Sequence, residues 1–70
     1  MRFAIVIEKA GKNFSGYVPD LPGCVATGKT VPETETRLRE ANSMHVASLR
    51  EDGLDVPMGL SVVEYVDVAA

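Results

Sequence analysis

Cys24 and His45 are the residues of this 70-residue chain whose side chains suit nucleophilic catalysis. A cysteine acts as a nucleophile when a base takes its proton and a further group orients that base. The chain has one cysteine and one histidine, which allow neither an internal disulfide nor a metal-ligand cluster. We interpret Cys24 as a buried strand residue and His45 as a half-buried packing or interface residue on a predicted helix.

Acidic residues offer a second kind of chemistry, because converging carboxylates can hold Mg²⁺ or Mn²⁺ for hydrolysis or phosphoryl transfer. Glu8 and Glu64 lie on strands that we expect to be neighbours. Such a site also needs a dry, shaped pocket, for which 70 residues leave little room, so solvated surface acids and helix caps are the favoured interpretation. A divalent-metal-dependent hydrolase or nuclease is the least favoured alternative, and we expect no catalytic residue, metal or other cofactor. The acids considered are Glu8, Asp20, Glu33, Glu40 and Glu64.

The composition is that of a folded globular protein, with 46% hydrophobic and 24% charged residues. We expect a single domain over residues 1–70. The longest apolar run, Phe3 to Ile7, is far shorter than the roughly 20 residues of a membrane span, and no signal-peptide pattern follows Arg2. We therefore expect a cytoplasmic protein. The net charge of −3, with scattered basic residues, favours a protein partner over a nucleic acid.

Three short strands are predicted in the first part of the chain. Residues 2–10, RFAIVIEKA, alternate two largely apolar sets, which is typical of a strand covered on both faces. The GKN turn at 11–13 leads to a second strand over 14–18. After the PDLPG turn at 19–23, residues 24–28 form a third strand. Hairpin connections of this kind predict an antiparallel meander.

A helix is predicted from about Val31 to Asp52. The TVPE sequence suits a capping box, in which Thr30 and Glu33 satisfy free N–H groups reciprocally. Gly53 is a typical helix stop. Spacings of three and four define one narrow helix face, formed by Val31, Thr34, Leu38, Ala41, His45 and Leu49.

Residues 60–68, LSVVEYVDV, predict a last strand that is rich in β-branched residues. A right-handed crossover through the helix returns this strand parallel to the third, beside the first, in the order 3-2-1-4. The fold class is therefore α+β, with the order β-β-β-α-β. One helix covers only one face of this sheet, and a domain of this size has a marginal core. We expect a second protomer to cover the other face, with interface candidates Ala4, Val6, Val63 and Tyr65.

The stretch GYVPDLPGCVATGKTVPE, followed by LREA in the helix and DGLDVP after it, resembles the HicB-like antitoxin family. The likeness spans residues 1–68 and implies a β-β-β-α-β fold, described for the family as a partial ribonuclease-H-like fold. The positions that carry it are Tyr17, Pro19, Asp20, Leu21, Pro22, Gly23, Cys24, Gly28, Thr30, Glu33, Glu40, Ala41, Asp52, Gly53 and Pro57.

The resemblance implies an antitoxin that neutralises a small, basic, mRNA-cleaving toxin of the HicA type by covering its active site. Tyr17 supplies a flat anchor, Asp20 either pairs with a basic partner or caps its own turn, and the prolines lower the entropy lost on docking. The residues expected to contact a toxin or a second protomer are Tyr17, Pro19, Asp20, Leu21, Pro22 and Gly23.

Many family members carry a C-terminal DNA-binding domain. The 70-residue sequence has no such segment, so we expect no direct DNA binding. We also expect a homodimer or a larger homo-oligomer. An orphan homo-oligomeric interaction or scaffold module without a toxin partner is the alternative function.

Overall fold

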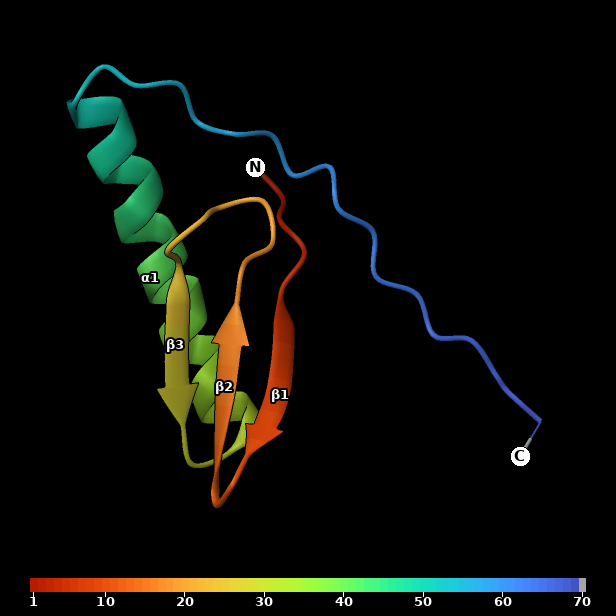
Figure 1. The fold of residues 1–70 in the computed structure, drawn as a ribbon. Helices are drawn as coiled ribbons and strands as arrows, with labels where there is room; N and C mark the ends of the chain where they lie inside the picture. Colours follow the sequence, from red (N-terminus) through yellow and green to blue (C-terminus); the bar gives the residue numbers. More distant parts are fainter. Residues whose placement is uncertain (70) are drawn as a thin grey trace.

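The computed structural model describes residues 1–69, so Ala70, the last residue of the expected domain, lies outside the described residues. In this described part of the chain, strands β1 (Val6–Ala10), β2 (Asn13–Tyr17) and β3 (Val25–Gly28) precede one helix, α1 (Val31–Glu51). Figure 1 shows the three strands side by side in one sheet, with α1 behind them. The predicted α+β class and the antiparallel meander are confirmed.

The sheet has the strand order β1-β2-β3, and both pairings are antiparallel. Strand β1 begins at Val6, four residues later than predicted, because its last partner on β2 is Tyr17. Beyond Tyr17 the chain turns away from β1 toward Pro19, which has no N–H to donate to a ladder. At the other end of the hairpin, Gly11 has φ of 63°, a backbone conformation that glycine adopts at little cost.

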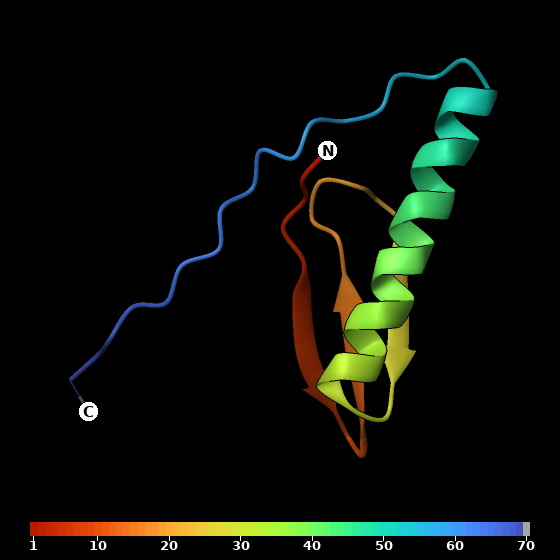
Figure 2. The same ribbon diagram turned by 180° about the vertical axis from the view of Figure 1, so that it is seen from behind.

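Helix α1 lies against one face of the sheet, as Figure 2 shows from behind. It approaches the sheet closely at two glycines. A Cβ atom on Gly16 would lie 3.1 Å from a methyl carbon of Leu38, and one on Gly28 would lie 2.6 Å from the Thr34 hydroxyl oxygen. The absence of side chains at Gly16 and Gly28 therefore allows the first half of α1 to sit on β2 and β3.

The core is small and lies where α1 crosses the sheet. Thr34 is fully buried beside this core, and its hydroxyl donates to the Thr30 carbonyl oxygen at 2.8 Å. The predicted helix face is thus confirmed at Thr34 and Leu38, whereas Val31 is exposed at the start of α1. The buried apolar residues are Val18, Leu21, Cys24 and Leu38, with Phe3, Ile5, Ala26, Ala41, Val46 and Leu49 packed against them.

Both ends of α1 lie close to their predicted positions. The Thr30 hydroxyl accepts from the Glu33 N–H at 3.2 Å, as expected of a helix cap. The Glu33 carboxylate, however, accepts from the Lys29 N–H at 2.8 Å rather than from that of Thr30. The predicted capping box is therefore displaced by one residue. Helix α1 ends one residue before the predicted position, with Asp52 as its cap and Gly53 at φ of 71°.

The predicted fourth strand is not confirmed. Residues 54–69 form an extended segment with no strand assignment. Within residues 1–69, no backbone hydrogen bond joins this segment to β1. Figures 1 and 2 both show it passing the N-terminus and then leaving the sheet. Where it runs beside the chain, its neighbours are residues 2–5, which precede β1 and form no ladder themselves.

Within residues 1–69, no helix has the combination of length and apolar character needed to cross a membrane.

Candidate partner-binding surface

The turn over residues 18–24 is closed by its own backbone. The Val18 N–H donates to the Cys24 carbonyl, the Leu21 N–H to the Val18 carbonyl, and the Cys24 N–H to the Leu21 carbonyl, each at 3.1 Å. Gly23 has φ of 84°, in the left-handed region that other residues seldom occupy. These contacts, with the fixed φ of the two prolines, make the turn a rigid element.

Leu21 was expected to face a partner, and the structure corrects this expectation. Its side chain is only 1% exposed and lies in the core with Val18, Cys24 and Leu38. Apolar burial of this kind holds the middle of the turn against the domain. Leu21 therefore positions the turn and offers no surface to a partner.

Asp20 is engaged within the chain. Its carboxylate accepts from the Ser61 backbone N–H at 2.9 Å and from the Ser61 hydroxyl at 2.9 Å. Ser61 lies 41 residues further along the chain, so Asp20 does not act as a cap of its own turn. Asp20 instead joins the turn to the extended C-terminal segment.

The exposed residues of the turn are Pro19, Pro22 and Gly23, and Tyr17 stands next to them at the end of β2. Because Gly16 faces α1 and neighbouring strand residues point to opposite faces, Tyr17 lies on the face away from the helix. The structure thus brings together four of the six predicted contact residues as exposed surface.

Tyr17 forms a row with one residue of each neighbouring strand. It pairs with Val6 on β1 and with Val25 on β3. Tyr17 is 42% exposed and Val25 63% exposed. We call Val6, Tyr17 and Val25 the open-face row. The next row on the same face is polar and consists of Glu8, Ser15 and Thr27.

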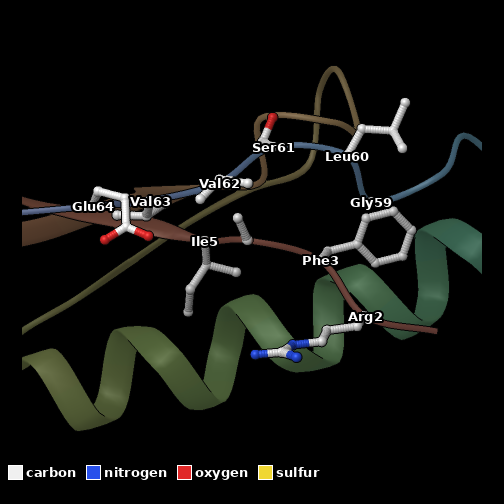
Figure 3. A pocket seen from close by; sticks show the side chains of 10 residues that line it. Arg2, Phe3, Ile5, Gly59, Leu60, Ser61, Val62, Val63 and Glu64 are labelled. Carbon is white, nitrogen blue, oxygen red and sulfur yellow. The ribbon is translucent and has the colours of Figure 1, made fainter.

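A cleft of about 550 Å³ lies between residues 2–5 and residues 59–64. Figure 3 shows that these two stretches run side by side in the same direction. A Cβ atom on Gly59 would collide with the Arg2 carbonyl oxygen, so only glycine permits this approach. Of the predicted interface residues, Ala4 and Val63 line the cleft, whereas Val6 and Tyr65 do not.

Cys24 is 3% exposed, and its burial raises the pKa of its thiol above the ordinary value. A raised pKa keeps the thiol protonated at neutral pH, and a protonated thiol is a poor nucleophile. His45 is half-buried on α1, as expected. The structure therefore supports a packing role for Cys24.

The acidic residues do not form the site that a metal-dependent enzyme would need. Among residues 1–69, no group of three or more histidine, cysteine, aspartate or glutamate side chains is placed to hold a metal ion. Glu64 lines the cleft, whereas Glu8 does not line it and pairs with Ser15 on the sheet. The expected strand pairing of Glu8 and Glu64 is therefore not formed.

Two residues of this surface were missed by the sequence reasoning. Val25 is opposite Tyr17 because of the hairpin register, which the predicted strand lengths allow to be worked out. Ser61 is the polar residue that interrupts an apolar run, and nothing in its neighbours indicates a contact with Asp20.

The sequence profile of the HicB-like antitoxin family of bacterial toxin–antitoxin systems matches residues 3–69. A 14.9 kDa uncharacterised protein from the rep-hol intergenic region of Haemophilus phage HP1 is 33% identical, over 96% of this chain and 50% of its own length. The crystal structure of the N-terminal domain of the Burkholderia pseudomallei antitoxin HicB superposes with a TM-score of 0.78 at 36% identity, covering 89% of this chain and 74% of that one.

A chain of the HicA3 and HicB3 toxin–antitoxin complex superposes with a TM-score of 0.68 at 33% identity. The matched region covers 79% of this chain and 64% of the chain in the complex. This chain thus spans half the length of the phage relative and less than two thirds of the chain from the complex.

Proposed function

This chain belongs to the HicB-like antitoxin family of bacterial toxin–antitoxin systems, and we propose that it neutralises a small HicA-type toxin that cleaves mRNA. Neutralisation occurs by covering the active site of the toxin. The observation that carries the proposal is the likeness to a chain of the HicA3 and HicB3 complex, over elements that include the sheet and the helix. A toxin that cleaves mRNA acts in the cytoplasm, so the proposal requires a cytoplasmic antitoxin.

The surface that we assign to the toxin is the open-face row together with the exposed part of the turn. Tyr17 lies at the centre of the row, between Val6 and Val25, and aromatic anchors flanked by apolar residues are typical of binding hot spots. Pro19 and Pro22 are exposed on a turn that is already rigid. A rigid surface loses little conformational entropy when it docks.

The negative net charge of the chain favours a positively charged partner. The chain carries a net charge of −3, and complementary charge accelerates association and disfavours wrong partners. In this proposal the antitoxin contributes no reacting group, because inhibition follows from occlusion of the toxin. The buried Cys24 thiol is consistent with such a passive role.

The experiment has two steps. First, the tagged chain is used at low salt to isolate a small basic protein from extracts of its native cells. The purified protein is then tested for cleavage of a fluorogenic RNA, with and without this chain. The proposal expects cleavage that stops at equimolar antitoxin. Cleavage that continues at a large excess of this chain would contradict it.

The first testable prediction concerns Tyr17. Tyr17→Ala should raise the antitoxin concentration needed for half inhibition about 30-fold, because a central aromatic anchor contributes about 2 kcal/mol or more. The matched control is Val31→Ala, since Val31 is 44% exposed on α1 and Tyr17 is 42% exposed on the sheet. Val31→Ala should inhibit like the wild type. Equal inhibition by both variants would remove the open-face row from the toxin interface.

An orphan homo-oligomeric module remains a second candidate function. It is favoured by one observation, the row of exposed apolar side chains on the extended C-terminal segment. Recovery of this chain alone from the native extract, at an oligomeric mass, would favour this candidate. The metal-dependent hydrolase is not proposed, because the acids that it requires do not gather within residues 1–69.

A further inference from the structure

A second cleft, of about 440 Å³, lies between residues 1–3 and the part of α1 that begins at Arg39. Phe3 and Val46 are half-buried along it and pack against the core, so the cleft has an apolar floor. Polar and charged side chains of α1 stand around this floor. We call the cleft the arginine groove and define it by Phe3, Arg39, Asn42, Ser43, Val46 and Arg50, which all line it.

The arginine groove is positive although the chain as a whole is negative. The chain has ten acidic and seven basic residues, yet within residues 1–69 no aspartate or glutamate lines the groove. Arg39 and Arg50 contribute two positive charges to it. Because a cleft lined by charges of one sign concentrates ligands of the opposite sign, the groove favours an anionic ligand.

Both guanidinium groups of the groove have hydrogen-bond donors to spare. Arg50 forms no ion pair within residues 1–69, and its Nη2 atom donates to the Met1 sulfur at 3.4 Å. A thioether is a weak acceptor, whereas a guanidinium carries five N–H donors. Arg39 pairs with Glu35 through Nη2 at 2.8 Å, which leaves its other N–H groups for a ligand. Both arginines are therefore available for carboxylate or phosphate groups.

The spacing of the two arginines suits an extended chain. Arg50 follows Arg39 by 11 residues, which is close to three helical turns, so both side chains lie on the same side of α1. This separation corresponds to about 16 Å along the helix axis. An extended peptide advances about 3.3 Å per residue. Two carboxylates that are about five residues apart in an extended peptide therefore match the two arginines.

The remaining residues of the groove favour a peptide over a nucleic acid. Asn42 and Ser43 lie between the arginines, and their side chains can form hydrogen bonds with peptide groups. Val46 offers an apolar floor to a side chain of the ligand. Phe3 packs against the core, so it is not free to stack on a base as in single-strand binding sites. The net charge of −3 also disfavours a polyanion.

We propose that the arginine groove binds an extended acidic peptide segment of a protein partner. One carboxylate of the segment binds Arg39, a second binds Arg50, and an apolar side chain between them rests on Val46. This partner differs from the basic toxin, whose charge has the same sign as the groove. The arginine groove and the open-face row share no residue, and the row lies on the sheet face away from α1. The two surfaces can therefore be occupied at the same time.

The test titrates the isotope-labelled full chain with the capped peptide Glu-Val-Thr-Leu-Thr-Glu and follows its amide chemical shifts by nuclear magnetic resonance. We expect the shifts to change at the residues of the arginine groove. The dissociation constant should be about tenfold lower than for Gln-Val-Thr-Leu-Thr-Gln, because charged hydrogen-bond partners bind more strongly than neutral ones. The peptide Val-Thr-Glu-Leu-Glu-Thr has the same composition but brings the acids closer together, so it should bind more weakly.

A pair of variants assigns the binding to the groove. Arg50→Gln should raise the dissociation constant of the acidic peptide about tenfold. Lys12→Gln is the matched control, because Lys12 is exposed in the turn between β1 and β2 and its substitution removes the same charge. It should bind like the wild type. Equal weakening by both variants would mean that only the net charge matters, and would overturn the proposal.

Three further results would also overturn the proposal. These are equal affinity for the acidic and the amide peptide, shift changes that lie outside the groove, and tighter binding of a short oligoribonucleotide than of the acidic peptide. The last result would assign the groove to nucleic acid. The titration needs no toxin, so this inference and the proposed function can fail separately.

Discussion

Cys24 is a buried titratable side chain, and its burial links the stability of this domain to pH. Burial raises the pKa of its thiol in the folded chain, whereas the unfolded chain retains the ordinary value of about 8.5. Above that pH the unfolded thiol loses its proton first, so the unfolded state binds fewer protons and gains stability relative to the folded state. The contribution of Cys24 is therefore fully present below about pH 8.5 and is lost as the pH rises through the folded pKa.

The prediction is a steeper alkaline loss of stability in the wild type than in Cys24→Ala. The slope difference is limited to at most about 1.36 kcal/mol per pH unit, the value for one proton. Urea unfolding of both proteins at pH 7, 8, 9 and 10 measures it. A difference that stays constant over this range would contradict the burial effect.

Among single residues, the burial of Leu21 and the hydrogen-bond partner of Asp20 could not be predicted from the sequence. The PDLPG pattern predicts a turn, because proline and glycine fix local backbone angles. It says nothing about which side chain faces the core, since that depends on where the turn rests against α1. Leu21 is buried in the core cluster that also contains Leu38 of the helix, and Asp20 accepts hydrogen bonds from Ser61, 41 residues along the chain.

At the scale of the elements, packing between α1 and the sheet depends on two missing side chains. A Cβ atom on Gly28 would lie 2.9 Å from the backbone nitrogen of Thr34, whereas one on Gly16 would meet only side-chain atoms of Leu38, Ile7 and Thr34, at 3.1 to 3.3 Å. Side chains can rotate away more cheaply than a helix backbone can shift. The two glycines should therefore differ in their tolerance of alanine.

We expect Gly28→Ala to lower the free energy of unfolding by about 1–3 kcal/mol, and Gly16→Ala to lower it by less. Chemical denaturation of both variants provides the comparison. Thr27→Ala, at an exposed neighbour on β3, is the control for substitution within that strand and should stay within about 0.5 kcal/mol of the wild type. A larger loss in Gly16→Ala than in Gly28→Ala would contradict this packing.

Local sequence patterns predicted the ends of the helix but not the pairing of the last predicted strand. The bounds of α1 follow from Thr30, Glu33 and Gly53, which act within a few residues of the helix ends, and these bounds were predicted to within one residue. Residues 60–68 have an equally clear strand pattern. A strand needs an edge to pair with, and that edge is not specified by the segment itself. The sequence therefore predicts the extended backbone but not its partner.

At the scale of the whole molecule, the balance between core and surface favours association. Within residues 1–69, four apolar residues form the buried core, whereas the apolar side chains of residues 60–68 are exposed. Small domains with so little buried surface commonly gain stability from a partner chain.

The last prediction follows from mass action. If folding and dimerisation are coupled, unfolding of the wild type depends on protein concentration, and each tenfold increase adds up to about 1.4 kcal/mol per dimer. The urea midpoint should therefore rise when the concentration increases from 2 to 200 µM, values on the order of those used for weak dimers. In Val66→Lys, which places a charge on the exposed apolar segment, the midpoint should depend less on concentration, because association is weakened while the monomer keeps the same core. A concentration-independent wild type would mean that the core alone stabilises the fold, and that the exposed segment is free for another partner.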